Sequence, residues 1–335
     1  MKEQGYDFIA DIHGHCDKLT ELLEKLGYRR RNGTFRHADG RQVVFLGDYI
    51  DRGPQVREVL QTVRAMCEAG DALAIMGNHE FNAICFATDD GRGGHLRQHS
   101  EKNLRQHAAT LCQFEGKDSE WQEWQHWMKT LDFSLDLGGA RAVHACWDRQ
   151  SIELLGGRKC TDDEFLSAAA ASGTAENRAM KLLLSGPEIR LPDGMHYLDK
   201  EKTHRQTVRV RWWELPEQAS AGELTMPTPI DVPSPLPGDI LRALPSYPPD
   251  DPPVFFGHYW LPSESTPGPL AKNIVCLDYS AGLTGPLTAY RWNGERCPAS
   301  RSFVGTRLKK SEHHPPPADR QVSEPPENIC LSLNT

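Results

Sequence analysis

The chain is organised around one short apolar run that passes directly into a polar turn. Residues 42–46 are rich in β-branched and aromatic side chains, as a buried strand is. The residues that follow are Gly47-Asp48-Tyr49-Ile50-Asp51-Arg52-Gly53-Pro54, in which glycine and proline favour a turn. Because ligands of open α/β folds bind at the carboxyl ends of strands, Asp48 and Asp51 are the first candidates for a metal or phosphate site.

Two similar apolar runs flank this one and are separated from it by helical patterns. Residues 6–10 precede a segment, residues 19–26, whose leucines recur at i, i+3, i+4 and i+7. A second helical pattern covers residues 56–67, and residues 71–76 form the third apolar run. Strands that alternate with helices in this order predict an α/β fold with a parallel sheet.

The middle of the chain is expected to add helices to this framework. Residues 81–130 have a largely helical pattern, and the three tryptophans within residues 121–127 are better explained as one buried helix face than as a base-stacking surface. A hairpin is predicted over residues 133–143, where Gly138-Gly139 makes the turn. Residues 150–195 are expected to be helical.

The last third of the chain combines strands with proline-rich segments. Residues 216–253 are predicted to be a long surface loop because prolines interrupt any regular pattern. From about Thr306 the chain is polar and aperiodic, which indicates a disordered tail. We therefore expect one domain over residues 1–305, containing the helical insertion and the proline-rich loop, and a tail over residues 306–335. Three further strands are predicted at residues 254–256, 274–277 and 287–292.

Five apolar runs end in side chains that are good ligands for metal ions. A single aspartate or histidine after a strand is commonly an ordinary loop residue, but five such strand ends in one chain indicate a shared site. Carboxylate, imidazole and amide oxygen together suit manganese, iron, zinc or cobalt, and no thiolate cluster competes with them. The candidate ligands are Asp11, His13, Asp48, Asn78, His144 and His258.

The size of this ligand set indicates two ions rather than one. Two divalent ions ~3.5–4 Å apart are the arrangement that enzymes use for hydrolysis of phosphate esters. A bridging carboxylate would hold such a pair, and Asp48 is the natural bridge because of its central position in the set. A water shared by the ions loses a proton near neutral pH and attacks phosphorus in line.

Other groups near these ligands suit the same chemistry. Arg52 offers two parallel donors for phosphate oxygens. His79 neighbours Asn78 without being needed as a ligand, so it is a candidate for protonating the leaving oxygen. Asp51 is placed to hold that imidazole protonated and oriented.

These motifs carry a family resemblance. Two of them resemble the central motifs of the phosphoprotein phosphatase family of calcineurin-like metallophosphoesterases, namely Gly47-Asp48-Tyr49-Ile50-Asp51-Arg52-Gly53 and Gly77-Asn78-His79-Glu80. The first motif of that family is similar to Asp11-x-His13-Gly14. Two later histidines of the family are expected where this chain has His144 and His258.

The resemblance covers about residues 6–148 and 254–292, and it implies an α/β fold with a β-sandwich of two mixed sheets flanked by helices. By resemblance, Arg52 is the phosphate-binding arginine, and His79 with Asp51 is the general acid pair. The implied cofactor is a pair of divalent metal ions, with manganese expected first and iron, zinc or cobalt as alternatives. By resemblance, Asp11 and His13 are ligands of the first metal, and Asp48 is the bridge between the two metals. The ligands of the second metal are Asn78, His144 and His258.

The chain departs from the family pattern at positions that concern the substrate. Ala145-Cys146 replaces the glycines after the fourth-motif histidine, and Tyr259 stands where animal-type protein phosphatases have threonine. The segments Gly257-His258-Tyr259-Trp260 and Gly285-Pro286-Leu287-Thr288 look closer to bacterial branches. Those branches include symmetrical diadenosine tetraphosphatases, PrpE-type enzymes and the Rhizobiales-like phosphatases, which favour phosphotyrosine.

We therefore expect a two-metal phosphomonoesterase that acts on phosphoproteins or small phosphoesters. The alternative is symmetrical hydrolysis of dinucleoside tetraphosphates such as diadenosine tetraphosphate. This activity needs a pocket for a base and would be favoured by a tryptophan pair near the metals. Candidate substrate contacts are Arg52 and a basic and aromatic group, namely Arg209, Arg211, Trp212 and Trp213, of which Arg211 and Trp213 are preferred. Residues 207–213 also fit a strand with an amphipathic exterior. A catalytically dead binding protein would have lost a ligand or the acid, and every one is present.

The composition excludes other classes of partner. The net charge of −8 argues against a nonspecific nucleic-acid binder, which is usually basic. The nine cysteines are scattered without a C-x-x-C pair, which indicates reduced thiols in the cytoplasm. No apolar signal region or membrane-length run occurs, so we expect neither secretion nor a membrane partner.

Overall fold

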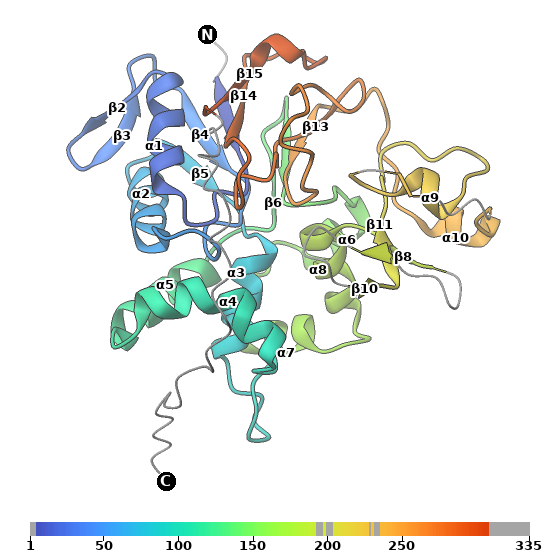
Figure 1. Cartoon of the computed structure of the whole chain (residues 1–335), viewed down its shortest axis with the longest axis horizontal. Helices are drawn as coiled ribbons and strands as arrows, with labels where there is room; N and C mark the ends of the chain where they lie inside the picture. Colours follow the sequence, from blue (N-terminus) through green and yellow to red (C-terminus); the bar gives the residue numbers. More distant parts are fainter. Residues whose placement is uncertain (1–4, 192–196, 199–203, 228, 231–234, 308–335) are drawn as a thin grey trace, which may run out of the picture.

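The computed structural model shows two β-sheets surrounded by helices (Figure 1). The first sheet has the strand order β15-β14-β1-β4-β5. Its strands β1 (Tyr6–Ile9), β4 (Gln42–Phe45) and β5 (Ala72–Ala74) run parallel, as predicted, while β14 (Thr288–Trp292) and β15 (Phe303–Gly305) are antiparallel to their neighbours. The structure describes residues 5–191, 197–198, 204–227, 229–230 and 235–307.

The second sheet has four strands in the order β13-β12-β7-β6. The predicted hairpin is present as β6 (Ser134–Asp136) and β7 (Arg141–Val143). The hairpin is extended in parallel by β12 (Val254–Phe256) and β13 (Ile274–Cys276). Each sheet therefore contains both parallel and antiparallel pairs.

The two sheets pack against each other through a shared apolar layer. Alternate residues of β1 and β4, among them Phe8 and Val44, belong to this layer, where the Phe8 ring stacks on Phe255 with centroids 3.8 Å apart. The intervening residues Ile9 and Phe45 belong to the cluster beneath the helices. Because both faces of these strands are buried, their sequences are continuous apolar runs rather than alternating ones. The predicted sandwich of two mixed sheets flanked by helices is confirmed.

The connections between β1, β4 and β5 contain the predicted helices and one unpredicted hairpin. The apolar faces of α1 (Cys16–Lys25) and α2 (Val56–Glu68) are buried as their patterns require. Between α1 and β4 the chain forms the hairpin β2 (Tyr28–Arg31) and β3 (Thr34–His37). Its turn, Asn32-Gly33, has φ angles of 50° and 83°, which are typical of a type I′ hairpin turn.

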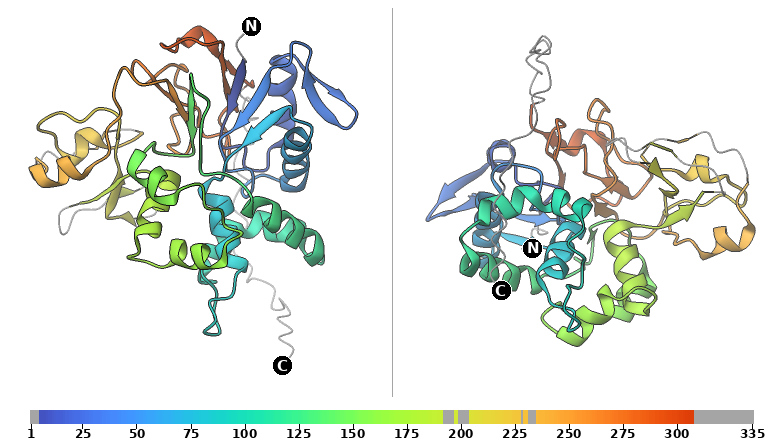
Figure 2. Two further views of the ribbon diagram at one scale, coloured as in Figure 1. Left: turned by 180° about the vertical axis from the view of Figure 1, so that it is seen from behind. Right: turned by 60° about the horizontal axis from the view of Figure 1, so that its bottom comes forward.

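The helices that follow β5 and β7 gather beyond the ends of those strands (Figures 1 and 2). The predicted helical insertion over residues 81–130 is present, with a non-helical connection at residues 88–100. Trp124 and Met128 are buried, in agreement with a packed helix face. The helices are α3 (Asn78–Ala87), α4 (Glu101–Phe114), α5 (Asp118–Lys129), α6 (Arg149–Leu155), α7 (Asp163–Ala170) and α8 (Ala175–Ser185).

The prediction of helix over residues 150–195 is wrong at residues 188–190, and residues 192–195 of that prediction lie outside the described residues. Gly186, with a φ of 75°, and Pro187 end α8, because a left-handed glycine and a proline cannot continue a helix. The chain then forms β8 (Glu188–Arg190), which pairs antiparallel with β11 (Thr207–Arg209). The strand predicted over residues 207–213 is accordingly shorter.

The prediction of a long loop over residues 216–253 is also wrong in part. This segment contains α9 (Ala221–Leu224), which begins with a capping box at Ser220 and Glu223, and α10 (Gly238–Ala243). Together with β8 and β11 these helices bury a separate small apolar cluster of Ile189, Leu191, Val208, Val210, Ala219, Ala221, Leu224 and Leu241. Short remaining elements are β9 (Tyr197–Leu198), β10 (His204–Arg205) and a 3₁₀ turn at Ser300–Ser302.

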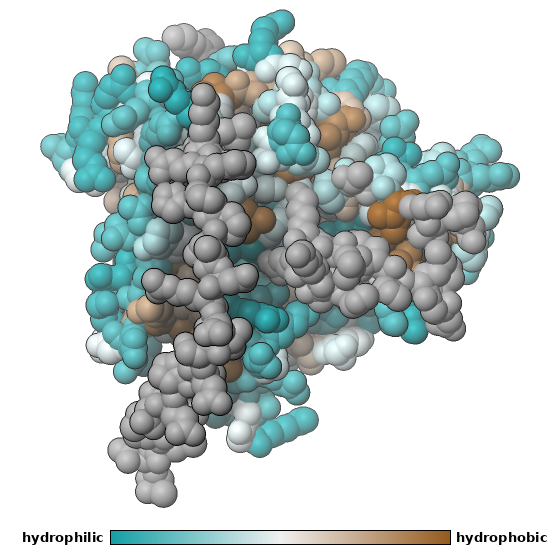
Figure 3. Space-filling model, viewed as in Figure 1, coloured by the Kyte–Doolittle hydropathy of each residue, from teal (hydrophilic) through white to brown (hydrophobic). Residues whose placement is uncertain are grey.

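The face shown in Figure 3 is largely hydrophilic, with apolar side chains in small scattered patches. Among the described residues, none of the helices combines the length and the apolar character that crossing a bilayer requires. The eight described cysteines are free thiols. The predicted tail lies outside the described residues from position 308 onward, and the domain boundaries stay a prediction.

Candidate metal centre and substrate cavity

The turns that leave the strand ends hold the candidate side chains on a strained backbone. Left-handed φ angles are uncommon in residues other than glycine and persist where the surroundings impose them, which is often at functional sites. Nine described residues other than glycine have a positive φ, and six are site candidates, namely Asp11, His13, Asp48, Asp51, Arg52 and His258. The candidate residues therefore share an uncommon backbone conformation as well as side chains suited to metal or phosphate binding.

Two glycines allow the central loops to touch. A Cβ atom on Gly47 would lie 2.4 Å from the backbone nitrogen of Gly77, and one on Gly77 would lie 2.3 Å from the backbone nitrogen of Asp48. Separations this short are incompatible with any side chain. The loops that carry Asp48 and Asn78 can thus pack against each other because Gly47 and Gly77 have no side chains.

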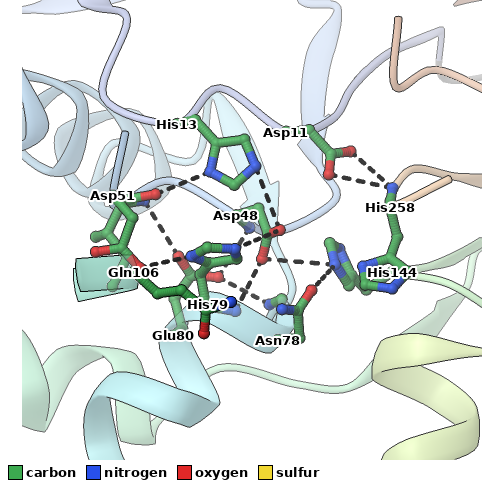
Figure 4. Close-up of polar contacts among 12 residues, drawn as sticks. Asp11, His13, Asp48, Asp51, Asn78, His79, Glu80, Gln106, His144 and His258 are labelled. Atoms are coloured by element: carbon green, nitrogen blue, oxygen red, sulfur yellow. Dashed lines mark hydrogen bonds and ion pairs between the residues drawn. The ribbon is translucent and has the colours of Figure 1, made fainter. Parts of the chain in front are cut away.

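The Asp48 carboxylate lies at the centre of the candidate ligands (Figure 4). Its Oδ2 is 3.5 Å from His13 Nε2 and 3.9 Å from His79 Nε2, and its Oδ1 is 3.5 Å from His144 Nε2. Two groups of potential ligand atoms share this residue, one with His13 and His79 and one with His144 and His258. Asp48 therefore lies between two groups of potential ligand atoms, and its role as a bridge stays a prediction.

The histidine rings are oriented by backbone carbonyls. His13 Nδ1 lies 3.0 Å from the Ile50 carbonyl oxygen, and His144 Nδ1 lies 2.7 Å from that of Leu46. A carbonyl only accepts hydrogen bonds, so both Nδ1 atoms carry the proton and both Nε2 lone pairs face the centre. In the described structure the Nε2 atoms of His13 and His258 are buried without a hydrogen-bond partner.

These imidazoles fit a metal centre electrostatically. Burial and the neighbouring His79 lower the pKa of His13 to about 3. Burial and the Arg209 guanidinium hold the pKa of His258 well below its ordinary value. Metal ligands must be deprotonated, so neutral imidazoles with bare, buried nitrogens fit divalent cations and leave an unsatisfied polar atom without them.

Asp11 and Asn78 also reach this region, in different ways. Both carboxylate oxygens of Asp11 accept from the His258 backbone N–H at 3.1 Å. Burial, Asp278 and Asp48 raise the pKa of the Asp11 carboxyl well above its usual value, as unneutralised neighbouring carboxylates do. Asn78 Oδ1 lies 3.0 Å from His144 Nε2. Their roles as ligands stay predictions, although a cation would relieve the repulsion among these carboxylates.

The predicted acid pair is in contact and belongs to a larger network. Asp51 Oδ2 is 2.5 Å from His79 Nδ1, and Asp51 Oδ1 is 2.7 Å from Nδ1 of His107. The Thr110 hydroxyl donates to Asp51 Oδ1 at 2.5 Å and accepts from the Asp51 backbone N–H at 3.0 Å. Burial alone would raise the pKa of Asp51, but hydrogen bonds from His107 and His79 hold it well below its usual range. His107 and Thr110 come from α4 and were not predicted.

Glu80 is a third residue whose role was not predicted. Its carboxylate accepts from the backbone N–H groups of Asp48 and Tyr49 at 2.8 Å and of Gly77 at 2.9 Å. It therefore ties the two central motifs together from beneath. Its position three residues after Gly77, at the start of α3, is the capping-box spacing and was a usable signal.

A cavity of about 840 Å³ opens beside these groups and is lined by Asp48, Asp51, Arg52, Asn78, His79 and His258 among others. The Arg52 guanidinium lies over the Trp260 ring, 4.1 Å from its centroid. Such stacking of a cation on an aromatic face holds it in place. Trp260 thus provides an aromatic surface in the cavity. The sequence pattern included it in the segment Gly257-His258-Tyr259-Trp260 but did not predict it as a substrate contact.

The structure does not bring Arg211 and Trp213 to this cavity. Trp213 is 8% exposed and packs on Trp212 and Phe256, with ring centroids 5.7 and 5.9 Å away. Arg209, which was also a candidate contact, lines the cavity and donates to the His258 carbonyl at 3.2 Å. The alternation of buried and half-buried residues continues past β11 through Val210, Arg211 and Trp212, but Arg211 and Trp213 are not among the residues that line the cavity.

Comparison with known proteins agrees with this geometry. Residues 6–172 match the family model of calcineurin-like phosphoesterases. The chain carries a calcineurin-like metallophosphoesterase domain. This match and the fold confirm the resemblance drawn from the motifs.

The curated relatives of this metallophosphoesterase match a limited segment. The chain is 45% identical over 74 residues to the asymmetrical bis(5′-nucleosyl)-tetraphosphatase PrpE of Halalkalibacterium halodurans, which is 22% of this chain and 30% of that protein. It is 47% identical over 75 residues to PrpE of Bacillus subtilis, covering 22% of this chain and 31% of that protein. The chain thus spans less than a third of the length of these relatives.

Solved structures are similar over most of the metallophosphoesterase chain. A serine/threonine phosphatase from Saccharomyces cerevisiae has 14% identity and a TM-score of 0.47, covering 93% of this chain and 82% of that one. A cold-active protein-tyrosine phosphatase of a Shewanella species has 17% identity and a TM-score of 0.42, covering 88% and 80%. At these scores the likenesses carry no argument about the substrate.

Proposed function

We propose that this protein hydrolyses phosphate monoesters at a centre that binds two divalent metal ions, manganese first, with iron, zinc or cobalt as alternatives. The observation that carries the proposal is the Asp48 carboxylate, which lies close to possible ligand atoms of His13 on one side and of His144 and His258 on the other. The Nε2 atoms of His13 and His258 are buried without a hydrogen-bond partner in the described structure. When bound, the ions supply a nucleophile at neutral pH by lowering the pKa of a water molecule.

The chain's own residues suit the remaining steps. Arg52, held by the Trp260 ring, offers two donors to the oxygens of the phosphoryl group. His79 donates a proton to the leaving oxygen from Nε2, because its Nδ1 is fixed by Asp51. Burial would lower the pKa of His79, but the Asp48 and Asp51 carboxylates raise it above its ordinary value, which favours the proton-bearing form.

A second candidate function is hydrolysis of dinucleoside tetraphosphates, the activity in the names of the PrpE relatives. The cavity volume of about 840 Å³ is large for a small monoester and favours this candidate. The burial of Trp212 and Trp213 in the core counts against it, because they were the expected stacking face for a base. We therefore rank phosphate monoesters first.

A direct competition tests the ranking. We expect the manganese-loaded protein to have a higher kcat/KM for phosphotyrosine or phosphoserine peptides than for diadenosine tetraphosphate. If the dinucleotide wins by more than about tenfold, or ~1.4 kcal/mol of transition-state preference, the ranking is wrong. If no phosphoester is hydrolysed in manganese, cobalt, iron or zinc, the proposed function itself fails.

A further inference from the structure

The loop between β13 and β14 contains a compact turn over residues 280–285. The backbone N–H groups of Leu283 and Gly285 both donate to the Ser280 carbonyl at 3.0 Å, and Ser280 has a left-handed φ of 64°. The turn is so tight that a Cβ atom on Gly285 would lie 1.8 Å from the Tyr279 carbonyl oxygen. The 280–285 loop is therefore closed by its own backbone hydrogen bonds.

One ammonium group from α1 contacts both ends of this turn. Lys18 Nζ donates to the Ala281 carbonyl at 2.6 Å and to the Gly285 carbonyl at 3.0 Å. These hydrogen bonds join positions 263 and 267 residues apart, so they connect the first helix of the chain to its last third. Lys18 is half-buried, and hydrogen bonds that involve a charged group are stronger than those between neutral groups. Lys18 thus stabilises the loop in one position relative to α1.

The loop packs directly on two residues of the candidate site. A Cβ atom on Gly282 would lie 2.7 Å from Cδ2 of His13 and 2.8 Å from Cδ of Arg52, so there is no space for a side chain at this position. The contacts are with the carbon edge of the imidazole and the alkyl stem of the arginine. No residue of the 280–285 loop is among those that line the cavity, so the loop supports these two side chains from outside the cavity.

We propose that Lys18 is a positioning residue, which holds the 280–285 loop against Arg52 and so fixes the guanidinium for the phosphoryl group. The Trp260 ring contacts the guanidinium, and Gly282 contacts the stem, so the two contacts restrict different parts of one flexible side chain. Restricting an arginine before the substrate binds reduces the entropy that binding costs. This inference rests on the proposed function, in which Arg52 binds the phosphoryl oxygens.

The first measurement is hydrogen exchange of the Leu283 and Gly285 amides in the metal-free protein, which requires no activity. Lys18→Met keeps an unbranched side chain but removes the donor, and we expect both amides to exchange about tenfold faster or more, as loss of a hydrogen bond to a charged group predicts. The matched control is Lys25→Met on the same helix, because Lys25 donates to the Gly305 carbonyl at 2.8 Å. The control should leave both exchange rates unchanged. Unchanged exchange in Lys18→Met would overturn the proposal.

The second measurement is hydrolysis of 4-nitrophenyl phosphate by the manganese-loaded protein, with inorganic phosphate as a competitive inhibitor. Lys18→Met should raise KM and the inhibition constant of phosphate by about three- to tenfold and change kcat and manganese content less, because His79 and the predicted ligands keep their contacts. Lys18→Arg keeps a charged donor and should restore most of the affinity, whereas Lys25→Met should leave the constants unchanged. Gly282→Ala should also raise KM, because its methyl group displaces the Arg52 stem.

The outcomes separate the role of Lys18 from the proposed function. Faster exchange with unchanged KM and inhibition constant would mean that Lys18 holds the loop without positioning Arg52, which overturns the proposal. If the wild type hydrolyses nothing, calorimetric titration of the manganese-loaded protein with inorganic phosphate decides. Weaker binding by Lys18→Met than by Lys25→Met then supports the proposal, and equal or absent binding refutes it. Should Lys18→Met not fold, the same phosphate measurements on Gly282→Ala decide, and unchanged constants there refute the proposal.

Discussion

The cavity has two walls that are built in different ways. The inner wall is made of turns that leave strand ends, with left-handed backbones at residues such as Asp48 and His258 and with glycines where the loops touch. The outer wall is made of helix faces and side chains such as Arg97 and His107, which are ordinary in backbone and are placed by tertiary packing. The inner wall holds the candidate metal ligands and the acid pair, and the outer wall touches that pair through the contact between His107 and Asp51.

The comparison predicts that substitutions in the inner wall abolish turnover and that substitutions in the outer wall change its rate by smaller factors.

Asp48→Asn should have the largest effect, because the shared carboxylate loses the charge that both ligand sets require. We expect metal content to fall and kcat to drop by roughly 10³-fold or more, given that metal ions contribute several kcal/mol to such reactions. Elemental analysis with a rate assay checks this, and the exposed Asp39→Asn is the matched control. Full occupancy of both sites in Asp48→Asn would remove the bridging role.

His79→Asn should come next, with normal metal content and a loss of roughly 10²–10⁴ in kcat, the usual contribution of a general acid. The loss should be smaller for 4-nitrophenyl phosphate than for phenyl phosphate, because a good leaving group needs less protonation. Rates across a series of leaving groups measure this. An equal loss at every leaving group would mean that His79 does not donate the proton.

The sequence predicted the inner wall far better than the outer one. Motifs such as Gly77-Asn78-His79-Glu80 are local, since each side chain is fixed by the strand or turn that carries it. The same reasoning found the parallel strands but missed the β2–β3 hairpin, whose Asn32-Gly33 turn was a readable signal. It had no access to His107, because the contact with Asp51 joins residues 56 positions apart and leaves no spacing in the chain.

The position of Arg211 and Trp213 outside the cavity lining has a related cause. The period-two pattern across residues 207–213 continues beyond β11, because Val210 pairs with Thr225 and Trp212 points inward and donates to the Ala145 carbonyl at 3.0 Å. Trp212 is fully buried, so the pattern reports packing into the core rather than a substrate-facing strand. Packing of this kind depends on the facing sheet, which the local sequence does not contain.

His107→Phe tests whether the outer wall reaches the chemistry. The variant keeps the ring shape but removes the hydrogen bond to Asp51, and such bonds to charged groups contribute about 1.5–3 kcal/mol. We expect kcat to fall by roughly tenfold, with KM and metal content unchanged and with the loss again smaller for 4-nitrophenyl phosphate. His126→Phe, at an exposed position on α5, is the control. A loss that is the same for every leaving group would indicate a structural effect and would separate His107 from the His79–Asp51 pair.

Trp260→Ala should have the smallest effect, because Trp260 acts on the substrate through Arg52. The ring lies 4.1 Å from the guanidinium, and an interaction of this kind contributes about 0.5–1 kcal/mol when partly exposed. Its loss should let Arg52 move and should raise KM by roughly two- to fivefold, while kcat changes less because the metal ligands and His79 are untouched. Steady-state kinetics with 4-nitrophenyl phosphate measures the two constants separately. Trp260→Phe keeps an aromatic face and should restore most of the affinity. If Trp260→Phe is as impaired as Trp260→Ala, the indole fills space rather than holding Arg52. Trp260 would then shape the cavity without orienting the guanidinium.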